Sequence, residues 1–158
     1  MTGFHYGNPK DVIKQGKITL PVYDFDGLEP MLHISNDTTY VVNFWATWCS
    51  PCMQELPGFS RLVEEYRGQK LRVILVNLDL KSHIKSDLLP YLNKTAILPM
   101  VVSLDDPNEN VWIDKVSPDW SGSIPATVIF KGNRRGFYEK SFEYAELNQL
   151  VSTYVYPQ

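Results

Sequence analysis

The pattern of apolar and polar positions along the chain predicts strands and helices in alternation. Nearly continuous β-branched and apolar runs at residues 38–44 and 71–78 are typical of central strands that are covered on both faces. Between these runs, apolar residues recur at steps of three, four and three, which places them on one face of a helix. These residues are Leu56, Phe59, Val63 and Tyr66.

The segment before the first central strand is predicted to form a hairpin. Residues 1–16 are expected to be a loose N-terminal segment, whereas residues 17–23 alternate in the manner of a half-buried strand. The turn signal Asp26-Gly27 follows, and residues 31–34 are expected to be the return strand. A single domain is therefore expected over residues 17–158.

The second half of the chain continues the alternation. The expected elements are a helix at 86–94, a strand at 100–104, a short helix at 110–116, a hairpin of strands at 126–130 and 136–139, and a closing helix whose apolar face carries Leu147, Leu150, Val151 and Tyr154. Pro90 is compatible with the first of these helices only in or near its first turn. The whole order predicts an α/β fold, in which a central mixed sheet has helices on both faces.

Composition narrows the range of functions. A chain of 158 residues with 44% hydrophobic residues is near the usual size of one domain, which buries about 70% of its unfolded surface. The formal net charge of −3 argues against nucleic acid and anionic membranes as partners, because both need a concentrated basic surface. No apolar stretch is long enough to span a bilayer, and the polar first residues predict no signal segment within this chain.

The chain has two cysteines, Cys49 and Cys52, and they are the strongest candidates for chemistry. A disulfide across so short a loop restrains little of the unfolded chain, so a disulfide-stapled scaffold is excluded. The pair follows a predicted strand and opens a predicted helix, where free N–H groups and the helix dipole stabilise a thiolate. Pro51 suits the first helical turn. We therefore assign Cys49 as the attacking nucleophile and Cys52 as the resolving thiol.

The alternative for this spacing is half of a zinc site. Such a site needs two more ligands, and the chain has no third cysteine. Its histidines, His5, His33 and His83, are isolated in the sequence. We accordingly expect neither a metal nor a cofactor.

Residues 42–52, Val-Asn-Phe-Trp-Ala-Thr-Trp-Cys-Ser-Pro-Cys, resemble the active-site strand and helix start of the thioredoxin superfamily, particularly its TlpA and ResA group. Pro57, eight residues after Cys49, matches the kink proline of that helix, where it removes the bond to the Met53 carbonyl. Residues 123–127 resemble the cis-proline loop that faces the cysteines in this family. For Pro125, an ordinary trans proline that enters a strand is the alternative.

The resemblance extends over about residues 17–154 and includes the N-terminal hairpin of TlpA-like proteins. Cys49 and Pro125 are 76 residues apart, more than in plain thioredoxin. A helix and a strand inserted between about residues 86 and 104 account for the difference, and such an insertion is a further mark of the TlpA and ResA group.

The chain also departs from thioredoxin. The buried acid of thioredoxin falls at Asn43, and an amide cannot take a proton from Cys52. In the ResA-like group an acid three positions after the second cysteine lies near the pair, and here that residue is Glu55. Helical spacing puts Glu55 on the Cys52 face, although a solvated helix glutamate is the alternative.

The resemblance assigns supporting roles around the pair. It implies that Trp48 shields the cysteines, that Ser50 and Pro51 tune the reduction potential together with Ile124, and that Ile124 and Pro125 contact substrate. Trp45 is expected in the core. Trp112 and Trp120 belong either to the core, as we expect, or to an apolar surface near Pro125.

These features predict a thiol:disulfide oxidoreductase with a Cys49–Cys52 redox disulfide. The resemblance favours a reductase of client-protein disulfides that works outside the cytoplasm and is recharged by an upstream partner such as a membrane thiol reductase. The alternatives are a disulfide oxidase or isomerase, a non-catalytic thioredoxin-like binding module and a thiol peroxidase. A peroxidase places Thr or Ser three residues before its reactive cysteine, where this chain has Ala46.

Overall fold

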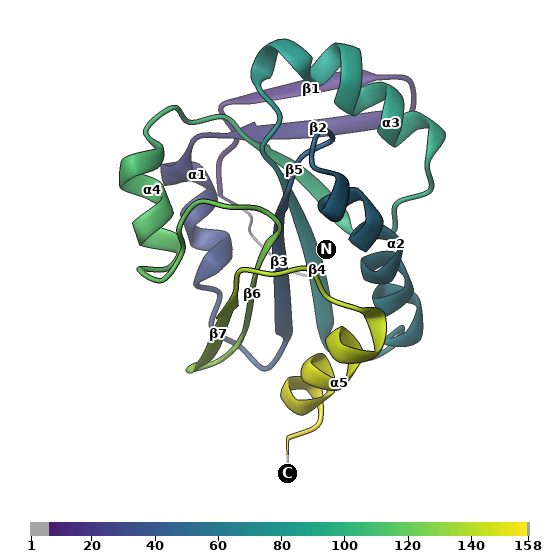
Figure 1. Ribbon diagram of the computed structural model, residues 1–158, viewed down its shortest axis with the longest axis vertical. Coiled ribbons are helices and arrows are strands. Elements are labelled where there is room, and N and C mark those ends of the chain that lie inside the picture. Colours follow the sequence, from purple (N-terminus) through teal and green to yellow (C-terminus); the bar gives the residue numbers. More distant parts are fainter. Residues whose placement is uncertain (1–6, 158) are drawn as a thin grey trace.

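The computed structural model describes residues 7–157. Within this range seven strands form one mixed sheet in the order β1-β2-β5-β4-β3-β6-β7 (Figure 1). The strands are β1 (Asp11–Gln15), β2 (Ile18–Tyr23), β3 (Thr39–Trp45), β4 (Leu71–Asn77), β5 (Met100–Leu104), β6 (Ala126–Lys131) and β7 (Arg134–Tyr138). Strands β2, β5, β4 and β3 run parallel, whereas β1, β6 and β7 pair antiparallel with their neighbours. The predicted α/β fold is confirmed.

Helices cover both faces of this sheet (Figure 1). The helical elements are α1 (Phe25–Leu28), η1 (Glu29–Leu32), α2 (Ser50–Glu65), η2 (Lys81–His83), η3 (Ile84–Leu88), α3 (Leu89–Lys94), α4 (Glu109–Val116) and α5 (Tyr144–Val155). The α2, α3 and α5 side chains join one apolar cluster, and those of α1, η1 and α4 join the other. The sheet therefore lies between two separate cores.

Strand β3 explains why its sequence reads as a continuous apolar run. All seven of its residues are buried. Val41 and Trp45 point to the cluster under α2, whereas Val42 and Phe44 point to the cluster under α4. A strand covered on both faces has no solvent side on which polar residues could alternate.

Helix α2 begins directly after the cysteine that follows β3. Of the predicted apolar face, Leu56, Phe59 and Tyr66 are buried and Val63 is half-buried. Leu62, which was not predicted, is buried as well. Pro51 lies in its first turn, and Pro57 lies inside it, where the proline has no N–H to donate to the Met53 carbonyl. The helix thus fixes the direction in which the cysteine motif leaves the sheet.

Two predictions for the N-terminal region are wrong. Residues 11–15 are not loose: they form β1, which pairs antiparallel with β2 and so supplies the first strand of the hairpin. Residues 31–34 do not form a return strand, because the preceding segment turns into α1 and η1. The Asp24 carboxylate caps α1 by accepting a bond from Gly27 N. Residues 1–6 of the segment expected to be loose lie outside the described residues.

The inserted segment between α2 and the proline loop widens the sheet. Its helix begins later than predicted, because the π-helical η3 precedes α3, and Pro90 accordingly lies in the first turn of α3. Its strand, β5, enters the sheet between β2 and β4. The insertion thereby joins the N-terminal hairpin to the central strands. The predicted short helix, final hairpin and closing helix correspond to α4, β6–β7 and α5.

Candidate active site

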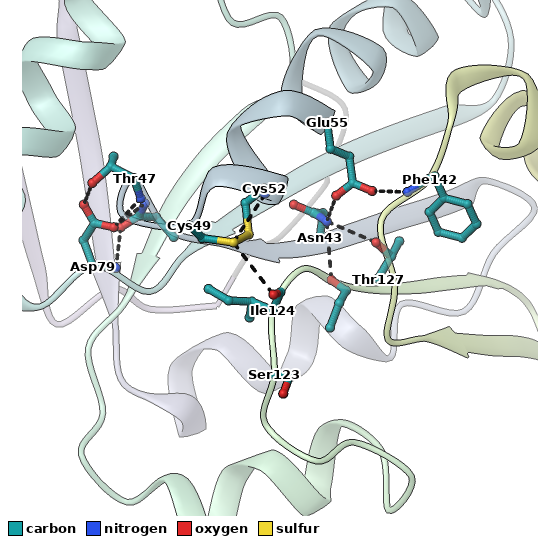
Figure 2. The surroundings of a disulfide bond; sticks show 12 residues. Asn43, Thr47, Cys49, Cys52, Glu55, Asp79, Ser123, Ile124, Thr127 and Phe142 are labelled. Atoms are coloured by element: carbon teal, nitrogen blue, oxygen red, sulfur yellow. Dashed lines mark hydrogen bonds between the residues drawn. A yellow bond between two sulfur atoms is a disulfide. The ribbon is translucent and has the colours of Figure 1, made fainter.

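The two cysteines lie where β3 ends and α2 begins, and they are joined by a disulfide (Figure 2). The chain makes a tight turn there, in which Cys49 N donates to the Ala46 carbonyl at 3.1 Å. Cys49 is the N-cap of α2, and its Sγ accepts a bond from Cys52 N at 3.3 Å. Cys49 is 5% exposed and Cys52 is 1% exposed. Both residues are therefore buried.

This position favours negative charge on the Cys49 sulfur. The first N–H groups of α2 have no partner within the helix, and one of them already points at Cys49 Sγ. The partial positive charge at the helix start acts in the same direction. When the disulfide is open, both effects favour negative charge on Cys49 Sγ. Ser50 and Pro51, between the cysteines, are exposed to solvent.

The proline loop faces the disulfide from the other side. The Ile124–Pro125 peptide bond is cis, and the Ile124 carbonyl oxygen lies 3.8 Å from Cys49 Sγ (Figure 2). Trp120 supports this loop from behind, because its Nε1 donates to the Ser123 carbonyl at 2.8 Å. The structure thus brings the predicted Ile124 and Pro125 to the cysteine pair, although they are distant in the sequence.

Glu55 is buried and is not a solvated helix glutamate. Its Oε2 accepts a bond from Phe142 N at 2.7 Å, and its Oε1 accepts one from Asn43 Nδ2 at 3.3 Å. Burial raises the pKa of Glu55 to about 7, because it disfavours the charged form more than the two donors stabilise it. Figure 2 shows Asn43 between this carboxyl group and the disulfide.

A small surface hollow lies beside Glu55. It has a volume of about 280 Å³ and is lined by Pro51, Gln54, Glu55 and residues 141–144, together with Gly58. Neither cysteine lines it.

Asp79 holds the turn before the cysteines, and sequence reasoning missed it. Its carboxylate accepts bonds from both the backbone N–H of Thr47, at 2.7 Å, and the Thr47 hydroxyl. Asp79 is buried and is oriented by Asn77, whose Oδ1 accepts from Asp79 N at 2.8 Å. The available signal was an acid directly after a buried parallel strand, at the same sheet edge as the cysteines.

The four tryptophans divide as expected between core and surface. Trp45, Trp112 and Trp120 are buried, which confirms that they belong to the core. Trp48 is 68% exposed and directly precedes Cys49. Its shielding role remains a prediction.

Over the described range, residues 7–157, no cluster of three or more His, Cys, Asp or Glu could hold a metal ion, and no helix could cross a membrane.

Sequence comparison relates this chain to known proteins. Residues 18–134 match the family model of the AhpC/TSA family. Thioredoxin-like protein YneN of Bacillus subtilis is 54% identical over 37 residues, which are 23% of this chain and 21% of that protein. Thiol-disulfide oxidoreductase ResA of Oceanobacillus iheyensis is 44% identical over 39 residues, 25% of this chain and 20% of that protein. These matches span about a fifth of each relative's length.

The fold of this chain is also found in a solved structure. A secreted thiol-disulfide isomerase from Corynebacterium glutamicum superposes with a TM-score of 0.66 over 94% of this chain and 82% of that chain, at 14% sequence identity. Identity this low shows a common fold and nothing further. The family model covers most of the chain and assigns the sequence. The chain belongs to the thioredoxin-like AhpC/TSA family, and it is similar to the thiol-disulfide oxidoreductase ResA.

Proposed function

We propose that this protein is a thiol:disulfide oxidoreductase that reduces disulfides in client proteins through Cys49 and Cys52. The observation that carries the proposal is the cysteine pair at the start of α2, with Cys49 Sγ 3.8 Å from the Ile124 carbonyl of the cis-proline loop. This arrangement combines a stabilised thiolate with an adjacent stretch of backbone against which a client can bind. The similarity to the thiol-disulfide oxidoreductase ResA also supports it.

The reaction is two successive thiol–disulfide exchanges. The Cys49 thiolate attacks one sulfur of a client disulfide, and the other client sulfur leaves as a thiolate that takes up a proton. The Cys52 thiolate then attacks Cys49 Sγ, which releases the client dithiol and forms the Cys49–Cys52 disulfide. Two electrons pass from the pair to the client, and an external dithiol must return the pair to its reduced form.

Glu55 is the group that we assign to the proton of Cys52. Cys52 must lose its proton before it can attack the mixed disulfide. Glu55 lies one helical turn further along α2 and has a pKa of about 7, so it takes up and releases a proton near neutral pH. The hollow beside it supplies the path by which that proton reaches solvent.

The client-binding surface in this proposal surrounds Cys49. The half-buried Ile124 forms one side, next to Pro125, which is itself buried, and the exposed ring of Trp48 forms the other. Ser50 and Pro51, exposed between the sulfurs, tune the reduction potential. Because the chain has no third cysteine, the pair must exchange electrons with another molecule.

Insulin reduction tests the proposed activity. With dithiothreitol as electron donor, the protein should accelerate precipitation of the insulin B chain, and Cys49→Ser should abolish the acceleration because the attacking sulfur is gone. Full activity in Cys49→Ser would contradict the proposal. Peroxide consumption, measured on the same samples, tests the peroxidase alternative. The apolar side chain of buried Ala46 in place of a hydroxyl argues against that alternative.

The proposed direction of electron flow rests on the resemblance to ResA-like proteins. We propose that this protein reduces its clients outside the cytoplasm and that a membrane thiol reductase returns it to the dithiol form. The fold shared with a secreted isomerase is compatible with that location. Equilibration against glutathione measures the direction. A reducing potential supports the reductase, and a strongly oxidising one assigns the protein as an oxidase or isomerase.

A further inference from the structure

The side-chain oxygen of Asn43 is a buried acceptor with no assigned role. Asn43 is fully buried in β3, opposite Thr127 of β6. Side chains alternate along a strand, so Asn43 shares a sheet face with Val41 and Trp45, which belong to the same cluster as Cys52. Its Oδ1 has no hydrogen-bond partner within the structure. Burial of such a carbonyl oxygen has a desolvation free-energy cost that no hydrogen bond offsets.

The orientation of the amide is fixed by its surroundings. Its nitrogen lies 3.3 Å from Glu55 Oε1, 3.1 Å from Thr127 Oγ1 and 3.4 Å from the Ala126 carbonyl oxygen. The Ala126 carbonyl oxygen can only accept, whatever the protonation state of Glu55, so the NH₂ group must face it. The oxygen is thereby turned to the opposite side. Figure 2 shows that this is the side of the disulfide.

Reduction changes what the oxygen faces. In the disulfide, Cys52 Sγ carries no hydrogen and has nothing to donate. A dithiol such as dithiothreitol breaks the Cys49–Cys52 bond by supplying two electrons and two protons, and it becomes a disulfide itself. Cys52 then carries an S–H group. Because Cys52 is 1% exposed, bulk solvent does not reach this group.

We propose that Asn43 Oδ1 accepts a hydrogen bond from the Cys52 thiol in the reduced protein. The proposal deepens the redox function proposed above and rests on its cycle. Asn43 is then a positioning residue that makes two hydrogen bonds. Its amide nitrogen donates to Glu55 and orients it, and its amide oxygen accepts from the resolving thiol and orients that. The oxygen without a partner in the disulfide gains one on reduction, so Asn43 shifts the thiol–disulfide equilibrium toward the dithiol.

The S–H stretching band of Cys52 tests this bond directly. A Cys49→Ala variant leaves a single thiol and adds no hydroxyl that could accept from it. At a pH below the Glu55 pKa of about 7, infrared spectroscopy should find this band below the frequency of the same thiol in the unfolded chain. Adding Asn43→Leu should return the band to the free-thiol frequency, because the acceptor is gone.

Matched variants separate this bond from general disturbance of the site. Thr127→Val removes a partner of the same amide nitrogen and should leave the band in place. Asn43→Ala removes the oxygen without adding bulk, and it replaces Asn43→Leu if leucine prevents folding. A free-thiol band in the Cys49→Ala protein itself, or a band that neither Asn43 variant moves, would overturn the proposal.

Glutathione equilibration of the two-cysteine protein supplies the energetic counterpart. Asn43→Leu should shift the equilibrium toward the protein disulfide by about five- to tenfold, the effect of one net hydrogen bond. Thr127→Val should shift it by less than about twofold. An unchanged equilibrium in Asn43→Leu contradicts the proposal for Asn43. If instead the wild-type disulfide does not exchange with glutathione, the redox function fails, while the infrared result still decides the bond.

Discussion

Glu55 places a carboxyl group where burial disfavours its charge. Its pKa is raised from 4.5 to about 7, so between these values the folded protein holds a proton that the unfolded chain releases. Stability must therefore fall as the pH rises through this interval, since the folded state binds more protons. Below pH 4.5 Glu55 is protonated in both states and does not change the unfolding free energy with pH. Above a pH of about 7 it is ionised in both states, and the full loss of unfolding free energy is present.

Replacement of Glu55 by glutamine removes this pH dependence. Urea denaturation of the oxidised wild type should show a loss of up to about 3 kcal/mol in unfolding free energy across the interval. Glu55→Gln should lack this loss, because the amide does not ionise. The exposed Glu109→Gln is the matched control and should follow the wild type. A wild-type stability that stays constant or rises across the interval would show that Glu55 does not titrate there.

The same substitution should alter thiol chemistry in the reduced protein. The alkylation rate of the cysteines as a function of pH reports when each thiolate forms. A second titrating group beside Cys52 adds an inflection near its own pKa of about 7. Glu55→Gln should lose that inflection. Superimposable profiles for the two proteins would remove Glu55 from the proton path.

Asp79 has a structural role that is testable by stability. Asp79→Asn keeps the shape of the side chain but replaces one of the two oxygens that accept from Thr47 by an NH₂ group. The lost buried bond should lower the unfolding free energy by about 1–3 kcal/mol, measured by urea denaturation. The exposed Asp87→Asn is the control and should change stability little. Equal stability of both variants with the wild type would show that the Thr47 turn does not depend on Asp79.

At the level of elements, the site is built where β3 passes into α2. The strand is held between β4 and β6, and the helix is held to the sheet by an apolar face that includes Phe59. Cys49, Cys52 and Glu55 all belong to this one junction. The proline loop before β6 comes close because β6 pairs directly with β3, for example through Asn43 and Thr127.

Truncation of Phe59 tests how far the helix depends on its buried face. Phe59 is fully buried, so Phe59→Ala should lower the unfolding free energy by about 3–5 kcal/mol in urea denaturation. Val111→Ala, in the exposed part of α4, is the comparison and should cost less than about 0.5 kcal/mol. A loss below about 1 kcal/mol for Phe59→Ala would mean that α2 is not anchored by this side chain.

Local patterns sufficed to predict the central elements and the cysteine motif. Buried strands and the α2 face are encoded by periodicity, and a C-x-x-C pair between strand and helix is a strong signal. The N-terminal region was predicted incorrectly because Met31 and Leu32 look like part of a strand. Their spacing from Phe25 and Leu28 is helical, and all four are buried.

The supporting contacts of the site were harder to predict because they join distant segments. Asp79 meets Thr47 only after β4 has paired with β3, and Phe142 N meets Glu55 only after the chain has returned from β7. Burial also decided the state of Glu55, which helical spacing left open. Contacts of this kind depend on tertiary packing rather than on local propensity.

For the whole molecule, the reactive pair is built into one of the two apolar clusters that hold the fold. Two apolar clusters on the two faces of the sheet hold the fold, and the reactive pair lies at one end of the central strand. One of these clusters includes both cysteines, so the disulfide is enclosed by packed side chains. The exposed Trp48 and the proline loop lie at this same end, where the proposed function places the client.

Trapping of a mixed disulfide tests the central claim most directly. Cys52→Ser lacks the resolving thiol, so its reaction with insulin should stop at a covalent adduct through Cys49. Non-reducing gels and mass spectrometry of tryptic peptides should detect this adduct, and dithiothreitol should cleave it by reducing the mixed disulfide. The Cys49→Ser protein should form little adduct, because Cys52 is the less exposed of the two and is not at the N-cap of α2, where free N–H groups favour a thiolate. An adduct absent from Cys52→Ser, or one equally abundant in Cys49→Ser, would contradict Cys49 as the attacking nucleophile.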